Sequence, residues 1–182
     1  MNIENNRIAV VTRLAEKCPN LGRTALMKYC YFLQTLRRVP LGYSFSLYSY
    51  GPFDSDVLAD LDATEAVGGV KTNIVYYSGG YGYRIEPGER TDSAKRWGTE
   101  FLAKYEGDID WVVAQFGSLG SARLELASTI VYSDREAASR SERLLPEQLA
   151  RRVQDVKPHF SNAQILGLLM DLHGRALLKS VQ

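Results

Sequence analysis

Within residues 23–50 the sequence passes from a helical pattern to a period of two, and few small folds accommodate that change. From Arg23 to Arg38, apolar residues recur every three or four positions, which predicts an amphipathic helix. Pro40 ends it. From Tyr43 to Tyr50, aromatic or apolar residues alternate with serine, as in a half-buried strand. A helix and a strand this close together favour an α+β fold.

Similar patterns predict a first helix over residues 6–17, a helix over 54–67 capped by Asp54 or Ser55, and a β-hairpin over 70–77 and 81–86. The order helix, helix, strand, helix, hairpin is the outline of a winged helix. We therefore predict a single domain, residues 1–182, that is mainly α with one small antiparallel β-sheet. Residues 1–88 form its winged-helix-like half, and residues 89–182 form a helical extension packed on that half.

Three helices are expected to make up most of the extension, after short helical stripes around residues 97–105 and 109–116. The first of them follows Gly120 and covers residues up to 131, and the polar stretch 132–145 is expected to be a loop. Pro146 is placed as the first residue of the next helix, and Ser161 as the cap of the last.

No motif predicts catalysis, a cofactor or a metal. The chain has no nucleophile elbow and no phosphate-binding loop, and Gly79–Gly82 is explained by the turn of the hairpin. His159 and His173 are too isolated to form a metal site. Asp60 and Asp62 point to different faces of their helix, so they are interpreted as solvated surface acids.

A cytoplasmic protein is expected. Cys18 and Cys30, the two cysteines, lack the spacing of a zinc site and are interpreted as small apolar residues in a reduced compartment. No apolar stretch of about 18 residues predicts a membrane span, and the polar N-terminus does not predict secretion.

The distribution of charge disfavours conventional winged-helix recognition of DNA. Residues 1–40 contain seven basic and two acidic residues, whereas residues 41–70 contain five acidic residues and none that is basic. The helix in the position of a recognition helix would therefore be repelled by phosphate. A DNA-binding regulator stays open as an alternative through a basic face on the first two helices, built from Arg7, Arg13, Arg23, Arg37 and Arg38. An enzyme with an unrecognised site is the further alternative.

Aromatic residues are concentrated in the predicted strand and hairpin, where Tyr43, Phe45, Tyr48, Tyr50, Tyr76, Tyr77, Tyr81 and Tyr83 occur. Because strand residues alternate between two faces, about half of these rings face one core. The rest either pack against the C-terminal helices or form an interaction surface, for which tyrosine is well suited.

Several short segments of the chain resemble the YwgA-like bacterial proteins. The segments are LMKYCYFLQ at residues 26–34, GYSF at 42–45, YGPF at 50–53, VLADLD at 57–62, LELASTIVY at 124–132 and VKPHF at 156–160. The first of these and the YGP turn also resemble, more distantly, the Panacea domain, which is associated with toxin–antitoxin pairs and with the SocA type of proteolytic adaptor. The chain departs from the Panacea pattern at residues 25–28, which are Ala-Leu-Met-Lys where that domain prefers Lys-Leu-Gln-Lys.

The resemblance implies a non-enzymatic, antitoxin-like or phage-defence-associated adaptor that binds a partner protein, a toxin or a defence effector. We place the partner contact on the aromatic strand, the turn after it and the acidic helix, where carboxylates would complement a basic partner. The predicted contact residues are Tyr48, Tyr50, Pro52, Phe53, Asp56, Asp60 and Asp62.

Overall fold

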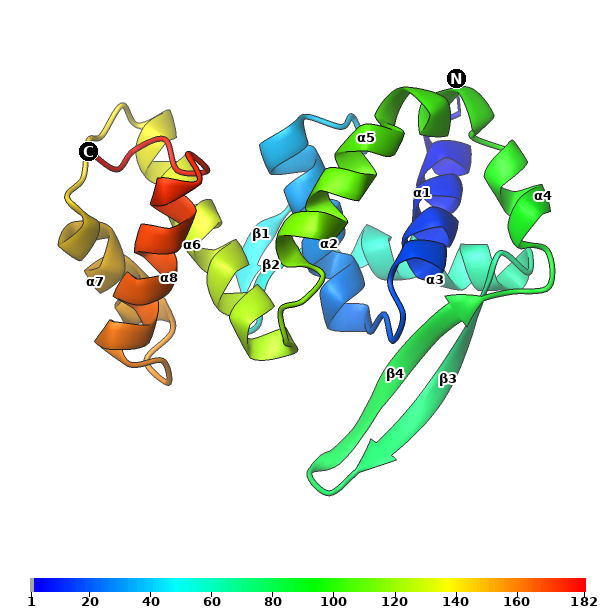
Figure 1. Cartoon of the computed structure of the whole chain (residues 1–182), viewed down its shortest axis with the longest axis horizontal. Helices are drawn as coiled ribbons and strands as arrows, with labels where there is room; N and C mark the ends of the chain where they lie inside the picture. Colours follow the sequence, from blue (N-terminus) through cyan, green and yellow to red (C-terminus); the bar gives the residue numbers. More distant parts are fainter. Residues whose placement is uncertain (1) are drawn as a thin grey trace. The chain divides into compact units, whose positions relative to one another are not determined.

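The computed structural model describes residues 2–182, which fold into eight helices and four short strands (Figure 1). The fold is mainly α with two small two-stranded β-sheets, and this confirms the predicted α+β class. The chain forms two compact units. The first comprises the described residues up to Phe45 together with Phe53–Ser118, and the second comprises Ser46–Pro52 together with Leu119–Gln182.

The first unit contains α1 (Ile3–Lys17), α2 (Arg23–Arg37), α3 (Ser55–Ala66), β3 (Val70–Tyr77), β4 (Gly80–Pro87), α4 (Thr91–Arg96) and α5 (Thr99–Phe116). Helix α1 packs against α3, α4 and α5, and α2 packs against α3 and α5. Their apolar faces form the core, in which the rings of Phe32 and Phe116 stack with centroids 4.0 Å apart.

Helix ends in this unit follow their sequence signals. The Asp54 side chain accepts a hydrogen bond from the backbone N–H of Asp56, so the predicted cap of α3 is confirmed. Beyond the end of α3, Gly68 adopts a left-handed backbone with φ of 77°. The chain then enters the hairpin.

Strands β3 and β4 form an antiparallel hairpin that projects from the helices of this unit (Figure 1). The predicted strand over residues 43–50 is shorter, β1 (Ser46–Tyr48), and pairs with β2 (Gly51–Phe53) instead of joining the hairpin. The expectation of one sheet is therefore wrong. Its physical cause is Gly51, whose φ of 90° suits glycine and lets the chain reverse at once.

The second unit contains β1, most of β2, α6 (Ser121–Ser139), α7 (Pro146–Val156) and α8 (Asn162–Gly174). These three helices pack pairwise on one another. Pro146 is the first residue of α7 and the Ser161 side chain caps α8, as predicted. The predicted loop at 132–145 is wrong in its first half, because α6 continues to Ser139 around a buried carboxylate, that of Asp134.

The Asp134 carboxylate binds the C-terminal segment of the chain. It accepts hydrogen bonds from the backbone N–H groups of Lys179 at 2.9 Å and Ser180 at 2.7 Å, and from the Ser180 hydroxyl at 2.7 Å. These bonds satisfy a charge that would otherwise be costly to bury. The polar residues 132–139 are therefore part of α6, and the Asp134 side chain on this part of the helix is buried.

Helices α4 and α5 belong to the first unit, so the division of the chain falls at Ser118, whereas the expected extension began at residue 89. Both helices pack on α1, and α5 also packs on α2. Within residues 2–182, none of the helices has the length and apolar character needed to cross a membrane.

Candidate functional site

The β3–β4 hairpin has one apolar face, which continues outward from the core. Directly paired residues share a face, and the pairs Thr72–Ile85, Ile74–Tyr83 and Tyr76–Tyr81 alternate with the pairs on the other side. At the base of the hairpin, Ile85 is buried. Further out, Tyr83 is half-buried, whereas Ile74, Tyr76 and Tyr81 are exposed. We call Ile74, Tyr76, Tyr81 and Tyr83 the aromatic face.

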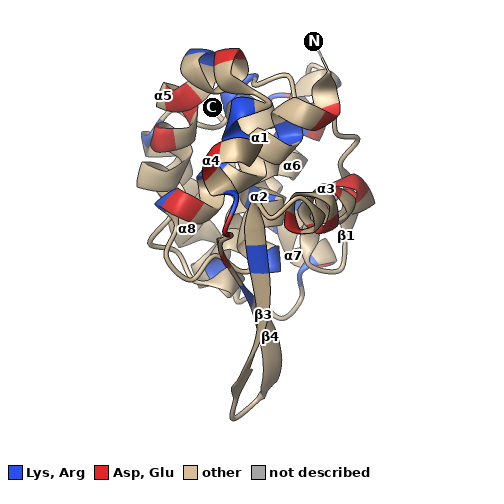
Figure 2. Cartoon of the chain, turned by 90° about the vertical axis from the view of Figure 1, so that its right-hand side faces the viewer, with Lys and Arg blue, Asp and Glu red and all other residues tan. Residues whose placement is uncertain are grey.

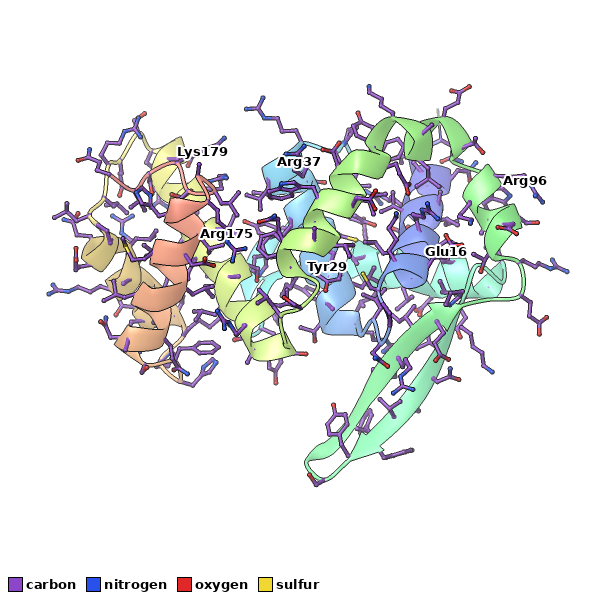
Figure 3. The ribbon with its side chains drawn as sticks, in the orientation of Figure 1. Glu16, Tyr29, Arg37, Arg96, Arg175 and Lys179 are labelled. Atoms are coloured by element: carbon purple, nitrogen blue, oxygen red, sulfur yellow. The ribbon has the colours of Figure 1, made fainter. Side chains whose placement is uncertain are left out.

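Exposure increases along the aromatic face towards the turn. Ile74 is 53% exposed, Tyr81 60% and Tyr76 81%. The rings of Tyr76 and Tyr81 have centroids 6.5 Å apart, and those of Tyr81 and Tyr83 are 5.9 Å apart. The three tyrosine rings therefore contact one another along the aromatic face. Rings stand out from the distal part of the hairpin in Figure 3.

The opposite face of the hairpin is polar near the base. It carries Lys71, Asn73, Arg84 and Glu86, and the Asn73 amide donates a hydrogen bond of 2.7 Å to Glu86. Figure 2 shows that the distal part of the hairpin carries neither basic nor acidic residues. Uncharged and rich in tyrosine, the tip has the composition of a protein-binding surface.

The edges of the hairpin are covered only near its base. On β4, the N–H of Ile85 donates to the Leu21 carbonyl at 2.7 Å. On β3, the N–H of Thr72 donates to the Glu65 carboxylate at 2.7 Å. A two-stranded hairpin is marginally stable alone, so these two contacts anchor the base while the tip extends beyond them.

Three of the five acids in and just before helix α3 form hydrogen bonds within the protein. Asp54 caps the helix and also accepts from the Ser44 N–H at 2.5 Å, and Glu65 binds Thr72. Asp60 is buried. Of the acids predicted to contact a partner, Asp56 and Asp62 are exposed, and the acidic surface of α3 is smaller than the sequence suggests.

The interpretation of Asp60 as a solvated surface acid is wrong. Its carboxylate accepts a hydrogen bond of 2.8 Å from the Tyr43 hydroxyl and lies 3.5 Å from the Arg7 guanidinium. Burial raises the pKa of Asp60, while the contacts with Tyr43 and Arg7 oppose that rise. The same burial raises the pKa of the Tyr43 hydroxyl above its usual range.

Arg7 organises this buried cluster. Its guanidinium donates to the carbonyls of Leu41 at 2.6 Å and Gly42 at 2.8 Å and lies 4.2 Å from the centre of the Tyr43 ring. It thus fixes the segment between α2 and β1. A side chain predicted as part of a basic face is instead buried in the first unit.

The other predicted nucleic-acid contacts are partly neutralised as well. Arg13 pairs with Glu106 at 2.5 Å and Glu16 at 2.9 Å, and Arg37 lies 2.7 Å from Asp108. Arg23 lies over the Tyr83 ring, 3.7 Å from its centre. Arg38 is exposed at the end of α2 and forms no ion pair with residues 2–182. Of the five predicted cations, Arg7, Arg13 and Arg37 are therefore paired with acids, whereas Arg23 and Arg38 have no acid partner among residues 2–182.

The remaining predicted partner contacts fall in both units. Tyr48 and Tyr50 belong to the second unit, where they are 67% and 73% exposed, and Pro52 is buried there. Phe53 belongs to the first unit and is half-buried. Two of the predicted contact residues, Tyr48 and Tyr50, therefore have exposed rings.

Residues of three segments that carry the resemblance, 50–53, 124–132 and 156–160, meet in the second unit. The sequence did not predict this contact. Lys157 is buried, with its ammonium 2.8 Å from Glu125 Oε1 and hydrogen-bonded to the Ser49 carbonyl. His159 is exposed and lies 3.4 Å from the same carboxylate oxygen. Gly51 packs on α6, where a Cβ would lie 3.0 Å from Ser128 Oγ. Contacts with α6 and with Lys157 thus hold the turn between β1 and β2 in place.

Cysteine and metal chemistry add no site. Cys18 and Cys30 are free and buried, and burial raises the pKa of their thiols to about 11 and about 12. Their interpretation as small apolar residues is confirmed. Among residues 2–182, no three His, Cys, Asp or Glu side chains cluster in a way that would hold a metal ion.

No protein-family model matches the chain, and no curated protein matches it significantly. The resemblances to the YwgA-like proteins and the Panacea domain therefore stay predictions.

Proposed function

We propose that this protein is a non-enzymatic, cytoplasmic binding module that captures a partner protein through the aromatic face of its β3–β4 hairpin. The observation that carries the proposal is the exposure of Tyr76 and Tyr81 on a projecting hairpin whose base alone is anchored. Large rings with polar tips gain binding energy from burial at low cost in side-chain entropy.

The class of partner follows from the resemblance and from charge. An antitoxin-like or defence-associated adaptor binds a toxin or a defence effector. Asp56 and Asp62, the exposed acids of α3, favour a partner with basic residues beside an apolar patch. Tyr48 and Tyr50 are a further proposed contact.

Binding to the product of the neighbouring gene tests the proposal. The double variant Tyr76→Ser/Tyr81→Ser removes two exposed rings and is expected to weaken the complex at least about a hundredfold, as the loss of two central aromatic contacts typically does. Tyr77→Ser is the matched control, because Tyr77 is 61% exposed on the opposite face. Equal affinity of the double variant and the control would reject the aromatic face as the contact.

Duplex DNA separates this proposal from the regulatory alternative. Because Arg7, Arg13 and Arg37 are paired with acids, we expect no gel shift with generic duplex at low salt. A complex whose affinity falls steeply with added salt would support the DNA-binding reading instead.

A further inference from the structure

The backbone of the β3–β4 hairpin points polar groups away from its ladder at every second residue. The N–H groups of Thr72 and Ile85, which are paired with each other, both donate to acceptors outside the hairpin. In an antiparallel ladder, pairs of this kind alternate with pairs that hydrogen-bond to each other. The next two pairs with outward N–H and C=O groups are therefore Ile74–Tyr83 and Tyr76–Tyr81.

The edge of β3 is open beyond its base. The outward N–H groups of Ile74 and Tyr76 have no acceptor among residues 2–182. The open stretch runs over residues 73–77, between the contact of Thr72 with Glu65 and the turn. Its sequence, Asn-Ile-Val-Tyr-Tyr, contains no charge and no proline, and its register with β4 has no bulge. Edge strands are usually protected by one of these devices, so this edge is free to pair.

The edge of β4 is less accessible. A Cβ on Gly22, just before α2, would lie 3.3 Å from the Tyr83 carbonyl oxygen, and Arg23 lies over the Tyr83 ring. Nearer the turn, β4 contains Gly80 and Gly82, and glycine weakens a strand. Of the two strands, β3 therefore offers the longer edge for pairing.

The lack of charge on the hairpin favours a second copy of this chain as the occupant of this edge. No charged residue occurs from Thr72 to Tyr83. Two such edges can meet without the like-charge repulsion that keeps many edge strands apart, whereas a charged segment would find no complementary group there. A second copy also brings two strands, and a sheet needs three or more strands with an apolar face to be stable on its own.

We propose that two copies of this chain dimerise by pairing their β3 edges antiparallel, about a two-fold axis at Val75. Residues 73–77 of one copy then face residues 77–73 of the other. Ile74 of each copy lies opposite Tyr76 of the other, and these two pairs exchange four backbone hydrogen bonds. Pairing centred on Val75 uses the whole open edge of both copies and leaves the contact of Thr72 with Glu65 intact.

The dimer joins the two aromatic faces. Directly opposed residues lie on the same face of a sheet, so Ile74 and Tyr76 of both copies share one side of the four-stranded sheet. Tyr81 and Tyr83 flank them on the outer strands. On the other side, the two Val75 side chains face each other across the axis. The dimer would double the surface proposed for partner capture, yet its formation requires no partner.

Sedimentation equilibrium of the full chain measures the association. Over protein concentrations from about 1 μM to about 1 mM, the range of weak interfaces, we expect the average mass to rise from 20.4 kDa towards twice that value. Ile74→Pro removes an N–H that the hairpin itself does not use, so the hairpin should still form. The variant should weaken the dimer at least about tenfold, because two hydrogen bonds are lost per dimer.

Two variants are the controls for Ile74→Pro. Ile74→Ala shortens the same side chain but keeps the N–H, and should weaken the dimer less than Ile74→Pro does. Tyr81→Pro removes an outward N–H from the edge of β4 and should leave the dimer intact. Amide NMR signals of Thr72 and Ile85 show whether the hairpin keeps its base in each variant.

Engineered cysteines test the register. In the proposed dimer the two Val75 residues form a pair that does not hydrogen-bond, the kind whose Cβ atoms are closest. Tyr77→Cys is the matched control, because its thiol lies on the same side of β3 but opposite Asn73 of the other copy. The native Cys18 and Cys30 are buried. Under mild oxidation, Val75→Cys should form an intermolecular disulfide at least about tenfold faster than Tyr77→Cys, as non-reducing electrophoresis measures.

Three results would overturn the proposal. The first is a mass of 20.4 kDa at every concentration, and if Ile74→Pro then weakens binding to the product of the neighbouring gene, the edge takes a strand of that protein instead. The second is a dimer that Ile74→Pro and Ile74→Ala weaken equally. The third is cross-linking of Tyr77→Cys as fast as that of Val75→Cys. None of these results decides partner capture by the aromatic face, which the Tyr76→Ser/Tyr81→Ser comparison measures separately.

Discussion

The hydroxyl of Tyr43 donates a hydrogen bond of 2.8 Å to the buried carboxylate of Asp60, across 17 residues of sequence. Arg7 lies against both groups. The contact ties the segment between α2 and β1 to the acidic helix α3. A residue that the sequence places on a binding surface thus has a structural role.

Because burial raises the pKa of Asp60, the folded protein binds a proton at the Asp60 carboxylate more tightly than the unfolded chain does. The stabilising contribution is complete below the ordinary pKa of an aspartate and is lost as pH rises through the raised value. We therefore expect wild type to gain stability relative to Asp60→Asn as pH falls from 7 towards 4. Urea unfolding of both proteins at several pH values measures the difference, and a gain with rising pH would contradict it.

Glu106 is expected to show the opposite dependence. Its contact with Arg13 lowers its pKa, so its contribution is present above the ordinary glutamate pKa and is lost as pH falls through the lowered value. In Glu106→Gln, the loss of stability between about pH 5 and pH 3 should be shallower than in wild type. Glu147→Gln, an exposed acid in the first turn of α7, serves as the control. Parallel curves for wild type and Glu106→Gln would contradict this expectation.

Gly51→Ala should destabilise the protein by about 1–3 kcal/mol, because alanine is strained at a φ of 90° and its Cβ would lie 3.0 Å from Ser128 Oγ. Thermal and urea unfolding measure the change. Gly79→Ala, in the hairpin turn, is the control, since a Cβ there meets nothing within 4 Å. Equal stability of the two variants would show that the turn at Gly51 relaxes freely.

Lys157→Met should cost about 3–5 kcal/mol, because it leaves the largely buried Glu125 carboxylate without its cation. The double variant Lys157→Met/Glu125→Gln should recover part of that loss, and the difference gives the coupling between the two side chains. Urea unfolding of all four proteins completes the cycle. Strictly additive losses would show that the pair contributes no specific stabilisation.

The sequence predicts the helices well where apolar periodicity and end signals agree. The stripe of α2, Pro146 at the start of α7 and the Ser161 cap are examples. The hairpin follows from its runs of Val, Ile and Tyr on either side of two glycines. Each of these signals is local, so a single segment contains all the information required.

Buried charges are where sequence reasoning fails. Arg7, Asp60, Asp134 and Lys157 all look like surface residues, because a segment gives no sign of a partner 17 to 108 positions away. The polar stretch of α6 was expected to be a loop for the same reason. Among the candidate site residues, alternation indicates that some tyrosines are exposed but does not identify Tyr48 and Tyr50 as the exposed ones. The separation of α3 from the turn by a unit boundary could not be predicted either.

The seven residues Ser46–Pro52 belong to the second unit although the chain on both sides of them belongs to the first. During synthesis, the Ser49 carbonyl cannot accept its hydrogen bond from Lys157 until more than a hundred further residues have been made. The second unit therefore cannot fold completely before then. If the chain were divided after residue 118, the C-terminal fragment would lack residues 46–52. The N-terminal fragment would contain this turn without the helices on which it packs. The chain is thus indivisible at any single peptide bond between its two units.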